Sequence, residues 1–138
     1  MIILTGYKGF IGQAFEKKLD PENLYRVEQS GAFDFLNQYD KWDEVEMILH
    51  QGAISSTTET DVNKIHKYNV EFSIALFEKA IEYSIPVKYA SSASVYGKIH
   101  SEYGYLKKTI NPLNFYALSK ATVDYWVIDN MDRFEQVQ

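Results

Sequence analysis

The chain begins Met1-Ile-Ile-Leu-Thr-Gly6-Tyr-Lys-Gly9-Phe-Ile-Gly12, and this stretch decides the fold. Its first residues form a short apolar run that ends at a glycine-rich turn, which is typical of a buried parallel strand. Apolar residues then recur at helical spacing, at Ile11, Ala14, Phe15 and Leu19. A strand that passes through a glycine turn directly into a helix predicts the start of a doubly wound α/β domain.

The glycines of this stretch follow the spacing GxxGxxG, at Gly6, Gly9 and Gly12. Gly6 permits the tight turn after the strand, Gly9 lets the backbone approach a ligand, and Gly12 lets the helix pack closely on the sheet. The N–H groups at the start of the helix, those of Phe10 and Ile11 included, are placed to receive a pyrophosphate. A glycine-rich turn without a ligand is the alternative, but the strand before the motif and the helix after it favour a dinucleotide.

An acidic residue at a suitable distance bears on the choice of dinucleotide. Glu28 lies 22 residues after Gly6, close to the ~20-residue spacing at which an acidic side chain bonds the ribose of NAD. Lys8 argues for NADP, because a cation in the glycine loop could approach a 2′-phosphate, although an exposed surface lysine is the commoner explanation. Asp34-Phe35 could hold adenine through a carboxylate and a backbone amide, or be an ordinary acidic loop.

The rest of the chain alternates strands with helices, which predicts one doubly wound parallel sheet in a single domain over residues 1–138. We expect further strands over 24–28, 45–50 and 86–90, and helices over about 60–84 and 113–134. A brief strand over 33–36, followed by a short helix, is the expectation for the ambiguous segment between them. The segment Gln51-Gly52-Ala53 is expected to end a strand beneath the cofactor.

The long helix 60–84 carries a second apolar stripe beside the first one. Its members are Val70, Ile74, Phe77 and Ile81. The two stripes together are wider than one contact with a sheet requires, so the second predicts either a buried core or contact with another subunit.

Composition excludes several classes of function. The chain has 14 Lys+Arg against 19 Asp+Glu, a net charge of −5, and only two arginines, which argues against a nucleic-acid binder. No apolar run approaches the ~20 residues of a membrane-spanning helix, so no membrane partner is expected. The absence of cysteine removes disulfides and thiolate ligands and fits the cytoplasm. His50, His66 and His100 show no metal-binding spacing, so no metal is predicted.

Three blocks of the sequence together resemble the extended short-chain dehydrogenase/reductase family, which acts mostly on nucleotide sugars. The blocks are Thr5-Gly-Tyr-Lys-Gly-Phe-Ile-Gly12, His50-Gln-Gly-Ala-Ile-Ser-Ser-Thr-Thr-Glu59 and Tyr89-Ala-Ser-Ser-Ala-Ser-Val-Tyr-Gly97. The second and third are similar to ADP-L-glycero-D-manno-heptose 6-epimerases, a group within that family. The resemblance covers nearly the whole chain but only the first half of such an enzyme, and the segment 20–45 is shorter than in the family. It implies a Rossmann-type domain that binds NAD or NADP.

The family's catalytic signature is Tyr-x-x-x-Lys, which occurs at Tyr103/Lys107 and at Tyr116/Lys120. The second pair falls on a predicted helix, where i,i+4 geometry points both side chains the same way, and we take it as the functional pair. A tyrosine hydroxyl titrates near pKa ~10, so a tyrosine base needs a positive field, which Lys120 can supply. The resemblance also implies that Lys120 bonds the nicotinamide ribose. A tyrosine beside a solvated lysine is the alternative.

The loop 91–97 bears on the type of reaction. By resemblance, Ser92 matches the serine that hydrogen-bonds the reacting sugar oxygen, with Ser94 as the next candidate and a simple turn serine as the alternative. Nucleotide-sugar 4,6-dehydratases usually carry an acidic pair just after this serine, but here Ala93-Ser94 stands instead. The resemblance therefore favours oxidation and re-reduction, and so epimerisation, over loss of water.

Other polar residues are candidates for contacts with cofactor or substrate. Asn69 is similar to the family's helix asparagine near the active site, or is an ordinary exposed asparagine. Three hydroxyl side chains could contact the substrate: Ser55, Ser56 and Thr57.

The resulting hypothesis is an NAD(P)-dependent nucleotide-sugar epimerase with Tyr116 as acid and base, Lys120 as its modulator and Ser92 as the oxyanion partner. A UDP-sugar 4-epimerase or a related sugar-nucleotide oxidoreductase is a neighbouring possibility. A second hypothesis is a dinucleotide-binding or assembly module without turnover of its own, because the chain stops soon after the catalytic helix. The resemblance also implies a homodimer formed through the helices 60–84 and 113–134.

Overall fold

The computed structural model describes residues 1–56, 58–98 and 110–138. They group into two compact units. The first, which we call the sheet unit, comprises Met1–Ala53, Ala75–Ala90 and Asp132–Gln138. The second, which we call the helical unit, comprises Ile54–Ile74 and Ser91–Met131.

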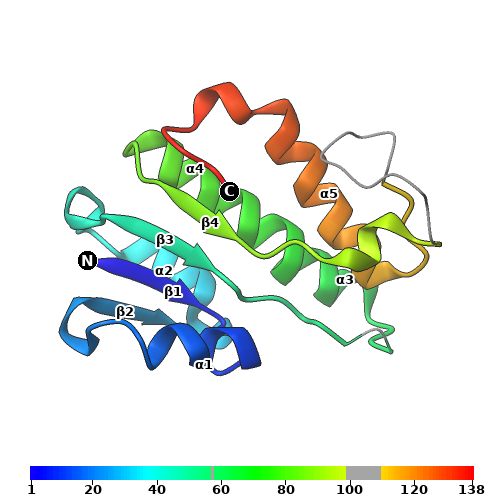
Figure 1. Ribbon diagram of the computed structural model, residues 1–138, viewed down its shortest axis with the longest axis horizontal. Coiled ribbons are helices and arrows are strands. Elements are labelled where there is room, and N and C mark those ends of the chain that lie inside the picture. Colours follow the sequence, from blue (N-terminus) through cyan, green and yellow to red (C-terminus); the bar gives the residue numbers. More distant parts are fainter. Residues whose placement is uncertain (57, 99–109) are drawn as a thin grey trace. The chain divides into compact units, whose positions relative to one another are not determined.

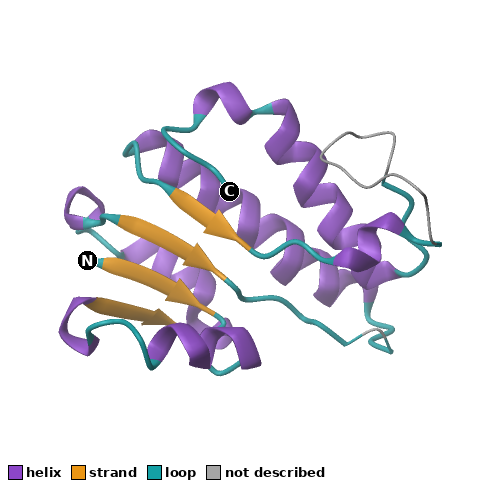
Figure 2. Cartoon of the chain, in the orientation of Figure 1, coloured by secondary structure: helices purple, strands orange, loops and turns teal. Residues whose placement is uncertain are grey.

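The sheet unit contains a four-stranded parallel sheet in the order β2-β1-β3-β4 (Figures 1 and 2). Its strands are β1 (Ile2–Thr5), β2 (Leu24–Val27), β3 (Met47–His50) and β4 (Val87–Tyr89). This is the order 2-1-4-5 within the Rossmann arrangement 3-2-1-4-5-6. The predicted doubly wound parallel sheet is therefore confirmed, and each of these four strands lies within one or two residues of its expected bounds.

Helices cover both faces of the sheet, as a doubly wound fold requires. Helix α1 (Phe10–Glu16) lies on one face, and α2 (Ala32–Gln38) lies on the other together with α4 (Phe72–Glu82) (Figure 1). On the α1 side, Leu4, Leu24 and Leu49 form a buried cluster, against which α1 and the turn after it pack Phe15 and Leu19. The opposite side is aromatic: Phe35 of α2 lies 5.4 Å from Tyr25 and 5.3 Å from Trp42 between ring centroids.

The expected strand over 33–36 is wrong, because these residues lie within α2. Phe35 and Tyr39 are four residues apart, and their rings lie 5.1 Å apart and both pack near Tyr25. This i,i+4 contact and the burial of Phe35 favour a helix over a strand. As a consequence no strand follows β2 on its outer side, and among the described residues β2 pairs only with β1.

The opposite edge of the sheet is covered by the last residues of the chain. Val137 forms a parallel bridge with Val87 of β4, and the N–H of Tyr89 donates to the carbonyl oxygen of Gln138 at 2.8 Å. In the predicted helix 60–84, α4 is preceded by α3 (Val62–Ile65) and a π-helical segment (His66–Glu71). Val70 and Phe77 of the second apolar stripe are buried within the chain, and Ile74 and Ile81 are partly buried.

The helical unit is built around α5 (Phe115–Asp129), which is shorter than the predicted helix 113–134. Asn114 ends the preceding loop and caps α5 by accepting a hydrogen bond from the N–H of Ala117 at 2.7 Å. Helix α3, the π-helical segment and the short 3-10 helix Ala93–Tyr96 all pack against α5. Among the residues described, no helix has the length and apolar character needed to cross a membrane.

Candidate functional site

Two glycines of the GxxGxxG loop are required by the packing of the sheet unit itself. Gly6 has φ +67°, and a Cβ there would lie 2.6 Å from the carbonyl carbon of Gln51. A Cβ at Gly12 would lie 2.1 Å from the carbonyl oxygen of Gly6. Both clashes are with backbone atoms, which cannot swing aside, so neither position accepts a side chain. The predicted roles of these glycines in the turn and in close helix packing agree with this geometry.

Gly9 differs from the other two glycines, because packing does not explain it. Among the described atoms within 4 Å, a Cβ there would meet only the carbonyl oxygen of Gly6, at 3.2 Å. Gly9 is exposed and is the N-cap residue of α1. The next two residues, Phe10 and Ile11, are 95% and 54% exposed. The loop therefore presents backbone N–H groups beside open space, which fits the pyrophosphate of a dinucleotide.

The residues Gln51-Gly52-Ala53 follow β3 directly and lie beside the glycine loop. The N–H of Gly52 donates to Thr5 Oγ1 at 2.9 Å, and Thr5 Oγ1 also lies 2.7 Å from Nδ1 of the buried His50. These bonds fasten the end of β1 to the end of β3. Neither Thr5 nor His50 was predicted to have a role, although each is the single polar residue at the end of an apolar strand.

Glu28 follows β2, and two residues of the glycine loop bind its carboxylate. The hydroxyl of Tyr7 donates to Glu28 Oε1, and Lys8 Nζ forms an ion pair with the same oxygen. The hydrogen bonds from Lys8 and Tyr7 lower the pKa of the Glu28 carboxyl, and Glu28 raises the pKa of Lys8. Lys8, considered above as a possible partner of a 2′-phosphate, is thus paired with the residue expected to favour NAD.

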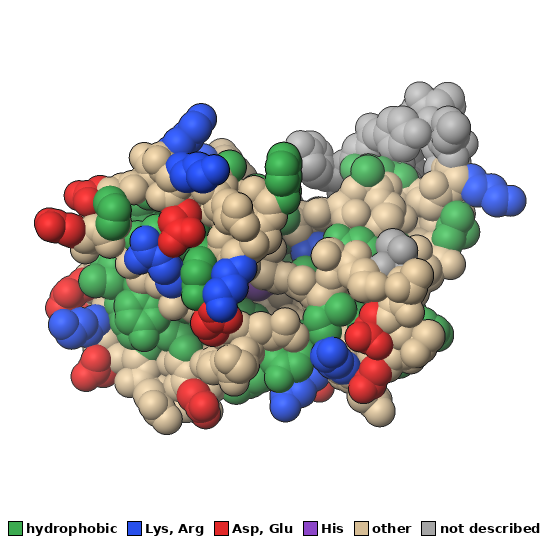
Figure 3. All heavy atoms as spheres, turned by 90° about the horizontal axis from the view of Figure 1, so that it is seen from below, with side chains coloured by type: hydrophobic (Ala, Val, Ile, Leu, Met, Phe, Trp, Pro, Cys, Tyr) green, Lys and Arg blue, Asp and Glu red, His purple; other side chains and the backbone are tan. Residues whose placement is uncertain are grey.

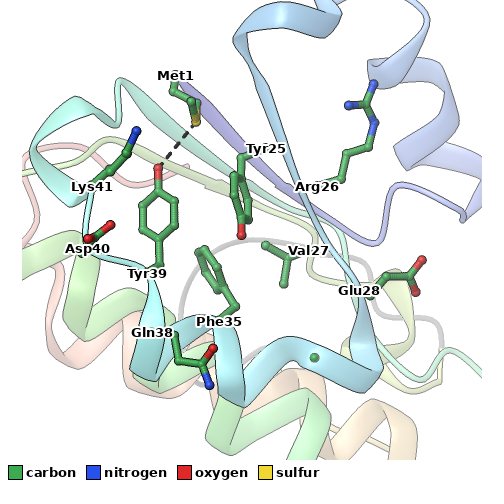
Figure 4. A pocket seen from close by; sticks show the side chains of 11 residues that line it. Met1, Tyr25, Arg26, Val27, Glu28, Phe35, Gln38, Tyr39, Asp40 and Lys41 are labelled. Carbon is green, nitrogen blue, oxygen red and sulfur yellow. Dashed lines mark hydrogen bonds between the residues drawn. The ribbon is translucent and has the colours of Figure 1, made fainter.

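A cavity of about 580 Å³ lies between β2 and α2. Figure 4 shows the rings of Tyr25, Phe35 and Tyr39 gathered in its middle, while the head groups of Arg26 and Glu28 point away from the rings. Phe35, predicted to contact adenine, is buried, and its ring lines this cavity. Asp34 lies exposed in the first turn of α2 and is not among the lining residues. The pairing of Asp34 and Phe35 around adenine stays a prediction.

In the helical unit, Tyr116 and Lys120 lie one turn apart on α5. Tyr116 is partly exposed, whereas Lys120 is only 3% exposed. Burial lowers the pKa of Lys120 to about 8, and the negative charge of Asp124, one turn further on, acts against this by raising it. Asp124 is itself 8% exposed. The burial of the lysine together with the aspartate was not predicted, although the i,i+4 spacing of Lys120 and Asp124 is present in the sequence.

The serine loop that leads into the helical unit is ordered by its own hydroxyl groups. Ser92 caps the 3-10 helix Ala93–Tyr96 by accepting a hydrogen bond from the N–H of Ser94 at 3.2 Å, and the two hydroxyls lie 2.8 Å apart. The preceding residue, Ser91, donates to Asp124 Oδ2 at 2.5 Å. The predicted serines Ser92 and Ser94 are therefore close together, and their loop is fastened to α5 through a residue that was not predicted.

Asn69 is 1% exposed and lies in the π-helical segment. Its Oδ1 accepts from the N–H of Ile54 at 2.7 Å, and its Nδ2 donates to the carbonyl oxygen of Ile54 and to Ser119 Oγ, both at 3.0 Å. Ser119 donates in turn to the carbonyl oxygen of Tyr116 at 2.7 Å. The alternative of an ordinary exposed asparagine is wrong. Asn69 joins the loop after Ala53 to the helix that carries Tyr116.

The remaining candidates are less constrained. Ser55 and Ser56 are exposed, and Ser56 Oγ lies 2.9 Å from Thr58 Oγ1. Thr57, His100 and the alternative pair Tyr103/Lys107 lie outside the described residues. Within the described ranges, no three His, Asp or Glu side chains are grouped as metal ligands. In the view of Figure 3, acidic and basic side chains are interspersed on the drawn face instead of gathering by sign.

Comparisons with known proteins agree on one family. The sequence pattern of the NAD dependent epimerase/dehydratase family matches residues 2–136. The chain is 33% identical to an ADP-L-glycero-D-manno-heptose-6-epimerase of Brachyspira hyodysenteriae over an alignment that covers 92% of this chain and 48% of that protein. The chain thus spans about half the length of this relative.

Solved structures share the fold. The crystal structure of the Helicobacter pylori ADP-L-glycero-D-manno-heptose-6-epimerase superposes with a TM-score of 0.77 at 23% identity, over 98% of this chain and 52% of that one. MoeE5 in complex with UDP-glucose and NAD superposes with a TM-score of 0.75 at 19% identity, over 99% of this chain and 52% of that one.

Proposed function

The chain belongs to the NAD dependent epimerase/dehydratase family, and we propose that it carries the cofactor-binding and acid–base residues of a nucleotide-sugar epimerase similar to ADP-glyceromanno-heptose 6-epimerase. The observation that carries the proposal is on α5, where Tyr116 lies one turn before a buried Lys120. A lysine that is nearly inaccessible to water is poorly suited to a surface role, and its charge acts strongly on a neighbouring hydroxyl.

Within this proposal the sheet unit holds the dinucleotide. The backbone of the Gly9 loop and the start of α1 would bind the pyrophosphate, because Gly9 leaves that side open. Glu28 would accept hydrogen bonds from the adenosine ribose through Oε2, since both of its described contacts use Oε1. The dinucleotide, when bound, would supply reversible hydride transfer to and from a sugar carbon. NAD is the expected cofactor and NADP the alternative.

The helical unit would supply the proton transfers. Tyr116 would remove the proton from a sugar hydroxyl during oxidation and return it after the keto sugar has turned its other face, so that the net change is inversion at one carbon. The positive charge of Lys120 would stabilise the phenolate that this requires. Ser92 accepts from the N–H of Ser94; if Ser94 also donates its hydroxyl, the hydroxyl hydrogen of Ser92 remains available to bind the sugar oxygen. Ser55, Ser56 and Thr57 are the proposed substrate contacts.

A second candidate function follows from the length of the match. Because the chain covers 48% of the heptose epimerase it resembles, it could bind the dinucleotide without turning over a sugar by itself. In that case, it would serve as a binding or assembly module.

Two measurements on the full 138-residue chain separate these functions. Titration calorimetry with NAD+ and with NADP+ tests the cofactor site. Incubation with NAD+ and ADP-L-glycero-D-manno-heptose, followed by NMR of the sugar, tests epimerisation, with UDP-glucose as the second sugar nucleotide and Tyr116→Phe as the control. Binding with turnover that Tyr116→Phe abolishes supports the epimerase, and binding without turnover supports the module. A folded chain that binds neither dinucleotide contradicts both.

We further propose that the chain forms a homodimer through the segments 60–84 and 113–134. Large apolar side chains remain exposed on these segments in the helical unit: Val62, Leu113, Phe115 and Leu118. Burying such side chains is favourable. Sedimentation equilibrium should therefore give twice the 16.0 kDa chain mass, and Leu118→Glu should return the chain to a monomer. A wild-type chain that sediments as a monomer contradicts the proposal.

A further inference from the structure

The carboxylate of Asp124 joins two parts of the proposed catalytic machinery. On α5 it lies four residues after Lys120, so that the two side chains share one side of the helix. It also accepts a hydrogen bond from Ser91, the residue that immediately precedes Ser92. One buried carboxylate is thus linked to the lysine beside Tyr116 and to the loop of the proposed oxyanion serine.

We propose that Asp124 is a positioning residue: its charge keeps Lys120 protonated in a buried site, and its bond to Ser91 fastens the Ser92 loop to α5. The proposal deepens the epimerase function and rests on it for its catalytic consequence. It assigns no contact between Asp124 and substrate or cofactor.

The need for such a residue follows from the burial of Lys120. A buried ammonium group is costly, and burial alone favours the neutral amine. A neutral amine would exert no positive field on Tyr116, so the lysine must keep its proton to act as proposed. A carboxylate one turn away opposes this effect of burial and favours the charged form without exposing the lysine to water.

The other ionisable groups near α5 that the structure describes do not supply this charge. The elements packed against the helix carry Lys64, His66, Lys67, Tyr68, Glu71 and Tyr96. Lys64, His66, Lys67 and Glu71 are exposed; Lys64 pairs with Glu59, and His66 lies 3.5 Å from Glu71. Of the described charges, only that of Asp124 acts appreciably on Lys120.

The Ser91 bond extends the role of Asp124 to the loop. Ser91 is 33 residues from Asp124 in sequence, so the contact fixes the loop to the helix independently of the chain between them. The loop is then ordered internally by Ser92 and Ser94. Movement of the carboxylate would displace Ser91 and with it the start of the 3-10 helix Ala93–Tyr96.

The test reads the charge of Lys120 directly and requires neither cofactor nor substrate. The full chain is labelled with 13Cε-lysine, the Lys120 signal is assigned with Lys120→Arg, and the signal is titrated by NMR. In Asp124→Asn, which keeps the shape but removes the charge, the ratio of protonated to neutral Lys120 at a given pH should fall by about tenfold or more. Asp129→Asn, an exposed aspartate at the end of the same helix, is the control and should leave the titration unchanged.

A folded Asp124→Asn chain in which Lys120 titrates as in the wild type overturns the proposal, as does an equal change in Asp129→Asn. Should Asp124→Asn not fold, Asp124→Ala is the second variant. The ratio of protonated to neutral Lys120 must fall in it as well, and an unchanged ratio in a folded Asp124→Ala chain overturns the proposal.

The loop half of the proposal has its own variant. Ser91→Ala removes the hydroxyl that Asp124 accepts but leaves the charge beside Lys120. We expect the amide signals of Ser92 and Ser94 to shift while the Lys120 titration stays as in the wild type; unshifted amides overturn the link to the loop. Because these readouts need no turnover, a chain that fails as an epimerase still gives a clear result for Asp124. In a chain that turns over, Asp124→Asn should lower kcat more than it raises KM, and most at high pH.

Discussion

In the glycine loop of the sheet unit, the residues that matter have no side chains, whereas on α5 of the helical unit they are buried side chains that carry charge. Gly6 and Gly12 are excluded from accepting even one carbon by backbone atoms within 2.6 Å and 2.1 Å of a Cβ. Lys120 and Asp124 are both nearly inaccessible to water. The first region is constrained by space and the second by electrostatics, so we expect substitutions in the first to act through steric clashes and substitutions at Lys120 to act through pH.

The largest effect is expected where space is the constraint. In Gly12→Ala the added Cβ would lie 2.1 Å from the carbonyl oxygen of Gly6, so α1 must shift away from the loop. We expect the free energy of unfolding to fall by about 3 kcal/mol. Gly9→Ala is the matched control, because its Cβ meets only one oxygen, at 3.2 Å, and it should cost about 1 kcal/mol as a changed helix cap.

Urea denaturation of the two glycine variants measures this difference, and titration with NAD+ sharpens it. Gly9→Ala should remain folded but bind the dinucleotide more weakly, since the methyl group occupies the open side of the loop. Equal losses of stability in the two variants would show that the loop is not constrained as its geometry indicates.

The second prediction concerns Lys120, where the pH dependence of stability measures the cost of burying a charged side chain. The pKa of Lys120 is about 8 in the folded chain against 10.5 for an ordinary lysine. Between these values the unfolded chain binds more protons than the folded one, so stability rises with pH across that window. The free-energy cost of burying the charged Lys120 side chain lowers stability in full below pH 8, and it is absent above about pH 10.5, where the lysine is neutral in both the folded and the unfolded chain. This residue alone should contribute about 3 kcal/mol to the rise.

Lys120→Met removes this contribution and keeps a long apolar chain in its place. The unfolding free energy of the wild type, relative to that of the variant, should therefore rise by about 3 kcal/mol from pH 8 to pH 10.5, as measured by urea denaturation at several pH values. Lys88→Met, at an exposed position of the sheet unit, serves as the control. A constant difference across this range would mean that Lys120 is not a buried charge.

The third prediction tests whether the helical unit also depends on neutral hydrogen bonds. Asn69→Ala leaves the N–H and the carbonyl of Ile54 and the hydroxyl of Ser119 without this partner. Loss of buried hydrogen bonds should cost about 2 kcal/mol. Asn63→Ala, on the exposed side of α3, should change stability by less than about 0.5 kcal/mol. Thermal denaturation distinguishes the two, and similar melting temperatures would contradict the role assigned to Asn69.

The difference between local and long-range contacts explains which parts of the fold could be predicted from the sequence. The glycine loop was predictable because most of the contacts that require its glycines are local. A Cβ at Gly9 or Gly12 would meet atoms of residues 6 and 7, and only Gly6 is limited by a distant segment, at Gln51 and Gly52. Strands β1 and β3 were predictable because they are buried on both faces and read as apolar runs. The segment 33–36 was misjudged because Phe33-Asp34-Phe35 alternates as a strand does, and only the packing of Phe35 and Tyr39 against Tyr25 favours the helix.

On α5, the spacing of Tyr116 and Lys120 identifies the pair in the sequence, but the side chains that surround the pair could not be predicted. The bond between Ser91 and Asp124 and the contact of Asn69 with Ser119 join residues 33 and 50 positions apart. Such contacts depend on how helices pack, which no local pattern encodes. Lys8 and Glu28 illustrate the same limit: treated separately they favour different cofactors, yet the fold pairs them.

That pair provides the smallest and most specific prediction, because it lies in the region where backbone otherwise dominates. Glu28→Ala removes the carboxylate that would bind the ribose and repel a 2′-phosphate, and it releases Lys8 from its ion pair. Affinity for NAD+ should fall and affinity for NADP+ should rise, so that their ratio changes by about tenfold. Titration calorimetry with both dinucleotides measures the ratio, and Glu22→Ala, at an exposed position before β2, is the control.

Because the pKa of Glu28 is lowered by Lys8 and Tyr7, the wild-type preference should persist to pH values below those at which an ordinary glutamate is protonated. An unchanged ratio in Glu28→Ala would mean that the loop recognises the dinucleotide through its backbone alone. Side-chain charge would then matter on α5 and not in the glycine loop.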